Sequence, residues 1–136
     1  MYRSGTDWCA LLGRVLLAAL FLPSGVNKLL HLQDTIGAVA QAGIPYAQIA
    51  APLAAAVETI GPLLLILGLF TRVGALALIA FTAAAAYFFH HYWDMSGAAR
   101  TSNQINFWKN VAVIGGLLYV TAFGAGLFAL DARRRR

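Results

Sequence analysis

The sequence has 136 residues, of which 60% are hydrophobic and 11% charged, with a mean hydropathy of +0.71 and a net charge of +5. This composition is far from that of a soluble domain and predicts an integral membrane protein. The basic residues form no groove-sized face, which argues against nucleic-acid binding. Four of the ten are the terminal run Arg133 to Arg136, a pattern typical of an anchor beside anionic lipids at the cytoplasmic surface.

Four apolar segments follow one another along the chain, at about residues 8–30, 49–70, 73–93 and 107–130. Each approaches or exceeds the roughly 20 residues that a helix needs to cross a bilayer. They are continuous apolar runs without the alternation of barrel strands. The sequence therefore predicts one all-α domain over residues 1–136, an integral membrane four-helix bundle. The first segment contains Arg14 and lacks a convincing cleavage site, so we expect a retained anchor and not a removed signal peptide.

The distribution of arginine predicts the topology. Four spans place both termini on one side, and Arg3, Arg72 and the terminal arginines share that side, which the positive-inside rule makes cytoplasmic. Two longer connections then lie on the outer face. The first, 31–48, has room for a short interfacial helix before the second span begins near Pro52, and the second, 94–106, is polar enough to be a lid or an exposed loop.

Glu58 is the only acidic residue inside the four apolar segments. A carboxylate at this depth costs about 2.5 to 3.5 kcal/mol on insertion scales, so we expect it to face a partner or a cavity. At a rise of 1.5 Å per residue it lies roughly 14 Å below the outer end of its helix. Arg14 approaches from the cytoplasmic half, whereas Lys28 and Lys109 reach down from the outer end by snorkelling. The sequence does not decide which of the three neutralises Glu58.

Further polar residues gather in the outer half of the predicted bundle. Ser24, Asn27 and Lys28 stand at i, i+3 and i+4, on one face of the first helix. The predicted catalytic residues are Glu58 and Lys109, and the predicted ligand-binding residues are Arg14, Ser24, Asn27, Lys28, His90 and Asn110. Because basic residues outnumber Glu58, this site is expected to be cationic and to take an electron-rich oxygen, as in a quinone, while Glu58 or a histidine handles a proton. The alternative for Glu58 is a purely structural ion pair.

Neither a metal nor a covalently attached cofactor is expected. His90 and His91 are adjacent and point about 100° apart on a helix, so they do not readily share a metal. Cys9 is the only cysteine, which excludes an internal disulfide, a CxxC relay and a cysteine metal cage. We expect Cys9 to be a small packing residue of the first helix.

Three stretches strongly resemble the signature stretches of the DoxX family of small bacterial membrane proteins: LLGRVLLAALFLPSGVNKL at 11–29, VETIGPLLLILGLFTRVGAL at 57–76 and FWKNVAVIGGLL at 107–118. The resemblance implies a multi-pass four-helix bundle in the bacterial plasma (inner) membrane. It also implies a polar pattern at Arg14, Ser24, Lys28, Glu58, Gly61, Thr71, Arg72, Lys109 and Asn110. The family's name comes from subunits of thiosulfate:quinone oxidoreductase, so the resemblance implies a quinone and oxidoreductase partner subunits.

The leading hypothesis is a membrane subunit of an oxidoreductase system that binds a quinone-like or other lipophilic ligand in an outer-half polar cavity. The lone cysteine argues against thiol relay chemistry within this chain. A small proton-coupled transporter is the main alternative, although small multidrug transporters carry their acid on the first helix, in a chamber that accepts cations. A non-catalytic membrane scaffold is the third. Membrane lipids are expected partners, and small-residue pairs such as Ala112 and Gly116 make a homo-oligomer plausible.

Overall fold

The computed structural model describes residues 3–133 and the side chains of residues 5–133, and every regular element in this range is helical. The elements are α1 (Arg3–Leu30), α2 (Leu32–Gln41), α3 (Ala47–Leu67), α4 (Thr71–Phe89), the 3-10 helix η1 (Tyr92–Asp94), α5 (Gly97–Phe123) and α6 (Leu130–Arg133). The predicted all-α class is confirmed.

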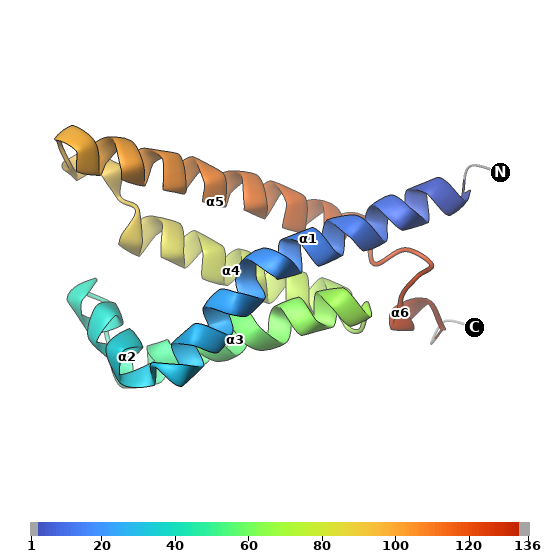
Figure 1. Ribbon diagram of the computed structural model, residues 1–136, viewed down its shortest axis with the longest axis horizontal. Coiled ribbons are helices and arrows are strands. Elements are labelled where there is room, and N and C mark those ends of the chain that lie inside the picture. The colour runs from blue at the N-terminus through green and yellow to red at the C-terminus, as the bar shows by residue number, and fades with distance from the viewer. Residues whose placement is uncertain (1–2, 134–136) are drawn as a thin grey trace.

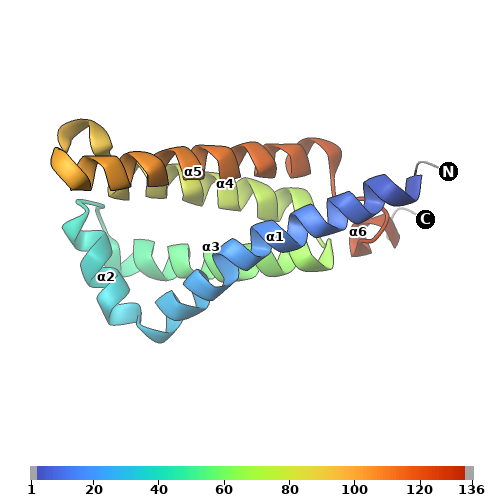
Figure 2. The same cartoon turned by 45° about the horizontal axis from the view of Figure 1, so that its top comes forward.

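The long helices pack in chain order. α1 packs mainly on α3, α3 on α4 and α4 on α5, whereas α1 and α5 meet over a smaller area. Figure 1 shows α4 and α5 side by side, with α1 crossing the other helices obliquely, and Figure 2 shows α2 folded back beside α3. The start of α1, the α3–α4 turn and α6 lie together at what we call the α6 end, and α2 and the start of α5 lie at the opposite α2 end (Figure 1).

Three described helical segments are long and apolar enough to cross a membrane: Gly5–Leu30, Ala47–Leu67 and Thr71–Asp94. These correspond to the first three predicted spans. α5, which contains most of the fourth, is not among them. The side chain of Arg3 and the residues Arg134 to Arg136, on which the predicted cytoplasmic termini depend, lie outside the part that the structure describes.

The two connections differ from one another. The first contains α2, where a short helix was expected, and α3 begins at Ala47, somewhat earlier than predicted. The second was predicted as a loop over 94–106, and this is wrong, because α5 already begins at Gly97. The polarity of this stretch reflects exposure and not irregular backbone, since alanine, arginine and glutamine all favour helix.

The fourth long helix also ends earlier than expected. It was predicted to continue to Leu130 but stops at Phe123, and Gly124 and Gly126 follow with φ of 81° and 77°. These are conformations that glycine adopts without the steric penalty of a Cβ. The chain therefore turns after Phe123, and residues 124–133 contact the start of α1 and the α3–α4 turn at the α6 end.

A small apolar core lies between the helices, formed by Ala18, Phe21, Leu65, Ala75, Leu78 and Leu117. Many large apolar side chains face outward instead, among them Trp8, Leu12 and Leu16 on α1. This is the arrangement expected for a protein surrounded by lipid, where packing and not water exclusion holds helices together. Cys9 is exposed, so its predicted packing role is wrong.

Candidate ligand-binding site

A cavity of about 950 Å³ lies at the α2 end, bordered by α1, α2, α3, α4 and α5. Its lining is mostly apolar, with polar side chains among the apolar ones. Ser24, Asn27, Lys28, His31, Asp34, Thr35, Glu58, Thr82, His90 and Asn110 supply the polar part, and Leu20, Phe21, Phe81, Phe88 and Phe89 are the largest apolar members. Largely apolar pockets with a few convergent polar groups are typical of small-molecule sites.

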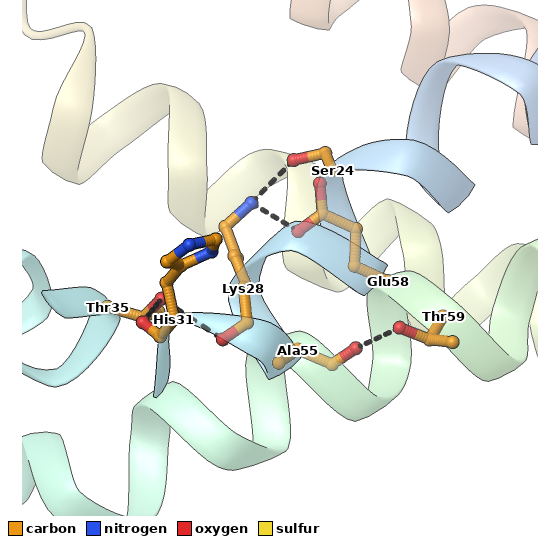
Figure 3. Close-up of polar contacts among 7 residues, drawn as sticks. All are labelled: Ser24, Lys28, His31, Thr35, Ala55, Glu58 and Thr59. Atoms are coloured by element: carbon orange, nitrogen blue, oxygen red, sulfur yellow. Dashed lines mark hydrogen bonds and ion pairs between the residues drawn. The ribbon is translucent and has the colours of Figure 1, made fainter. Parts of the chain in front are cut away.

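Lys28 neutralises Glu58. Its ammonium lies 2.5 Å from Oε2 of Glu58 and also donates a hydrogen bond of 2.7 Å to Oγ of Ser24, as Figure 3 shows. The side chain of Glu58 is 6% exposed and that of Lys28 30%. The carboxylate is thus buried while the ammonium borders the cavity. The ring of Phe81 lies beneath the same ammonium at 5.7 Å, within the range of a cation–π contact.

A close crossing of α1 and α3 makes this pair possible. A Cβ added to Gly25 would lie 2.5 Å from the backbone carbon and oxygen of Glu58, so only glycine allows the observed approach. Pro62, four residues beyond Glu58, has no N–H to donate to the carbonyl of Glu58. The freed carbonyl faces Gly25, and Lys28, one turn further along α1, reaches the carboxylate.

α2 closes one side of the cavity and is tied to the end of α1. Oγ1 of Thr35 donates to the carbonyls of Lys28 and His31, at 3.3 and 3.0 Å (Figure 3). Val39 of α2 is buried. The position of α2 places His31, Asp34 and Thr35 on the wall of the cavity.

Both histidines of the lining have an assignable tautomer when neutral. Nδ1 of His31 lies 3.1 Å from the carbonyl of Asn27, and because a carbonyl only accepts, Nδ1 carries the proton. Nδ1 of His90 lies 2.9 Å from Oδ1 of Asn103, whose amide nitrogen donates to the carbonyl of Ala99. In each ring Nε2 is then the acceptor.

The structure brings together six of the eight residues predicted for the site: Ser24, Asn27, Lys28, Glu58, His90 and Asn110. Arg14 and Lys109 do not line the cavity. His31, Asp34 and Thr35 were not predicted from the sequence, although a signal was present. Their positions continue the helical spacing that runs through Ser24, Asn27 and Lys28, beyond the predicted end of the first span at residue 30.

The charge of the site consequently differs from the expectation. Lys28 is the only lysine or arginine in the lining, and two carboxylates, Asp34 and Glu58, accompany it. With neutral histidines the lining is therefore slightly negative, and the predicted cationic site is wrong. The prediction counted Arg14 and Lys109 because depth along a helix says nothing about the face on which a side chain lies.

Arg14 belongs to the α6 end. It is 1% exposed and donates to the carbonyls of Leu65, at 2.8 Å, and of Phe128, at 2.6 Å. Nearby, the carboxylate of Asp131 accepts hydrogen bonds of 2.9 Å from the backbone N–H groups of Phe70 and Thr71, at the start of α4. These contacts hold the C-terminal segment against α3 and α4.

Among the residues that the structure describes, no three histidine, cysteine, aspartate or glutamate side chains are grouped as metal ligands would be. The polar groups that the cavity offers a ligand for hydrogen bonding and ion pairing include Lys28, Glu58, Asp34 and the two histidines.

Apolar helices of spanning length around a mostly apolar pocket with a buried charge pair define a helical, multi-pass membrane protein. The model of the DoxX family matches residues 9–91, and the chain belongs to this family. It is 37% identical over 123 residues to the inner membrane protein YphA of Escherichia coli strain K12, an alignment that covers 90% of this chain and 88% of the relative. It is 31% identical over 125 residues to the inner membrane protein YqjF of the same organism, covering 92% and 91%. The protein is thus a multi-pass protein of the bacterial inner membrane. No solved structure matches it.

Proposed function

We propose that the protein binds a quinone-like or other lipophilic ligand in the cavity at the α2 end, and serves an oxidoreductase system as a membrane subunit. The observation that supports this most is the Lys28–Glu58 pair on the wall of a mostly apolar cavity. A buried charge pair that only stabilised the fold would need no cavity beside it. The cavity volume of about 950 Å³ is at the upper end of the usual range for small-molecule sites and accommodates a ring with part of a tail.

The proposal includes a topology. α5 would be the fourth span, and the α6 end would face the cytoplasm, so that the cavity opens in the outer half of the bilayer. α5 packs along α4 for much of its length, which supports this arrangement. Single cysteines introduced at Arg100 and Arg133 in a Cys9→Ser background test it. We expect a membrane-impermeant maleimide to label position 100 from outside intact cells and position 133 only after lysis, and the reverse pattern contradicts the topology.

Ligand binding is tested with the purified protein in nanodiscs, titrated with decylubiquinone and a short-tailed menaquinone, each in its oxidised and its reduced form. Lys28→Met should weaken binding at least about tenfold, as expected for the loss of a charged hydrogen-bond donor. Lys109→Met is the matched control, because Lys109 is the only other lysine and lies outside the cavity. Wild-type protein that binds neither compound would contradict the proposal. Equal losses of affinity in Lys28→Met and Lys109→Met would show that Lys109 also contributes to the binding site.

Proton-coupled transport is the second candidate, and the presence of two carboxylates with one lysine in the lining favours it. Because Glu58 is deep and Asp34 exposed, the cavity holds acids at two depths. Proteoliposomes that take up an externally added lipophilic amine with a change in internal pH, both only when Glu58 is intact, would favour transport over the oxidoreductase role. A scaffold instead predicts that Glu58→Gln lowers thermal stability and changes neither flux nor binding.

A further inference from the structure

The charge of the cavity bears on the kind of polar head that a ligand presents. Lys28 contributes one positive charge to the lining, and Asp34 and Glu58 contribute two negative charges. The ammonium of Lys28 uses two of its three N–H donors on Ser24 and Glu58, which leaves one for a ligand. With neutral histidines, a ligand that enters therefore meets a lining in which the negative charges outnumber the positive one.

The hydrogen-bond acceptors of the lining are also largely unused. Oε2 of Glu58 accepts from Lys28, but within residues 5–133 no side chain or backbone group donates to Oε1 of Glu58 or to the carboxylate of Asp34. Nε2 of His31 and of His90 are acceptors as well, since Nδ1 of each ring carries the proton. Hydrogen bonds to an ionised acceptor are roughly twice as strong as neutral ones.

The unused donors are mostly neutral. The side-chain amides of Asn27 and Asn110 line the cavity and donate to no described group. A carbonyl oxygen of a ligand gains an ordinary hydrogen bond from either amide, and the remaining N–H of Lys28 offers it a single bond from an ammonium that Glu58 already neutralises. A hydroxyl of a ligand gains a charge-assisted bond to a carboxylate instead, and the deeper carboxylate, Glu58, is the better shielded from water.

We propose that the site selects a lipophilic ligand whose head donates a hydrogen bond, a phenol or a quinol, over the matching carbonyl or ether compound. This rests on the proposed function, because it names the ligand class for the same cavity. The hydroxyl donates to Oε1 of Glu58, and the tail runs along Phe81, Phe88 and Phe89. Specificity of this kind is strong because an analogue without the hydroxyl covers the acceptor and leaves it unpaired.

The test uses one pair of compounds that share a tail and differ in one donor, 4-dodecylphenol and 4-dodecylanisole, with the full-length protein in nanodiscs. Partition into empty nanodiscs is subtracted from both titrations. Wild-type protein should bind the phenol at least about tenfold more tightly. Glu58→Gln should reduce the preference to about threefold or less, because a neutral acceptor replaces a charged one.

Asp34→Asn provides a second variant at an exposed position, where folding is not at risk, and Asp94→Asn at the η1 helix is its matched control outside the cavity. We expect a reduction of about twofold for Asp34→Asn and none for Asp94→Asn. Equal binding of phenol and ether by the wild-type protein overturns this inference and leaves the proposed function standing. If neither compound nor any quinone binds, the proposed function itself fails.

Discussion

The two ends of the molecule each hold a cationic side chain in apolar surroundings, but the partners of the two cations differ. At the α6 end Arg14 is 1% exposed and donates to carbonyls at the end of α3 and in the C-terminal segment. At the α2 end Lys28 pairs with Glu58, remains 30% exposed and borders a cavity. A cation that bonds backbone carbonyls of distant segments fixes the path of the chain. A pair that borders a cavity keeps part of its hydrogen-bonding capacity for a ligand.

The difference also explains why Arg14 suits a structural role and Lys28 suits ligand binding. Arg14 has a fork of donors that can bind two carbonyls at once, and a lysine has a single ammonium in its place. The Nε atom of Arg14 is buried as well and has no hydrogen-bond partner among the described residues. At the α2 end, by contrast, Lys28 approaches Glu58 along a wall that a ligand can also reach.

The largest expected effect is at the α6 end. Arg14→Met removes both donors and leaves the carbonyls of Leu65 and Phe128 without partners, so we expect the free energy of unfolding to fall by about 3 kcal/mol. Unfolding by SDS in mixed micelles, followed by circular dichroism, measures this. Arg72→Met is the matched control, because Arg72 is exposed and makes one bond of 3.2 Å to Ala122, and it should cost about 0.5 kcal/mol.

Ligand binding by the folded Arg14→Met protein should be unchanged. If the variant instead keeps its stability and loses binding, Arg14 is a ligand group, as the sequence analysis expected, and the contrast between the two ends fails.

A smaller effect is expected at the helix crossing. Gly25→Ala places a Cβ 2.5 Å from the backbone of Glu58 and 2.6 Å from Oγ1 of Thr59. α1 and α3 must move apart, which typically costs about 1 to 3 kcal/mol in a packed interior. Because the Lys28–Glu58 pair spans this crossing, binding of the ligand should weaken together with stability, as measured by the same micelle unfolding and nanodisc titrations.

Gly13→Ala on the same helix is the control, since a Cβ there meets nothing within 4 Å. It should be neutral or stabilising by up to about 1 kcal/mol, because alanine favours helix over glycine. Similar losses in the two variants would show that the effect is one of α1 as a helix and not of its contact with α3.

Much of the fold and part of the site could be predicted from the sequence. Continuous apolar runs identify the first three spanning helices, and the spacing of Ser24, Asn27 and Lys28 identifies one polar face of α1. The depth of Glu58 marked it as a residue that needs a partner. These features are local, because they depend only on helix period and on the cost of placing a charge in lipid.

The remaining features depend on contacts between distant segments. The choice of Lys28 as the partner of Glu58 follows from the approach of α1 to α3 at Gly25, and sequence spacing carries no such information. For Asp34 the helical spacing that begins at Ser24 is a partial signal, but its place on the cavity wall depends on α2 folding back beside α3 (Figure 2). The predicted positive charge of the site was wrong because the depth of a residue along its helix does not show which other helix its side chain meets.

The smallest expected effect is the coupling within the pair itself. Lys28→Met leaves a buried carboxylate without its cation, so it should destabilise the protein more than the double variant Lys28→Met with Glu58→Gln, in which neither charge remains. A double-mutant cycle in mixed micelles should give a coupling energy of about 1 kcal/mol, because the exposed ammonium is partly solvated. A coupling of about 3 kcal/mol or more, comparable to the expected loss on removing Arg14, would make the pair a structural lock like the one at the α6 end. The main observation in favour of ligand binding in the adjacent cavity would then be lost.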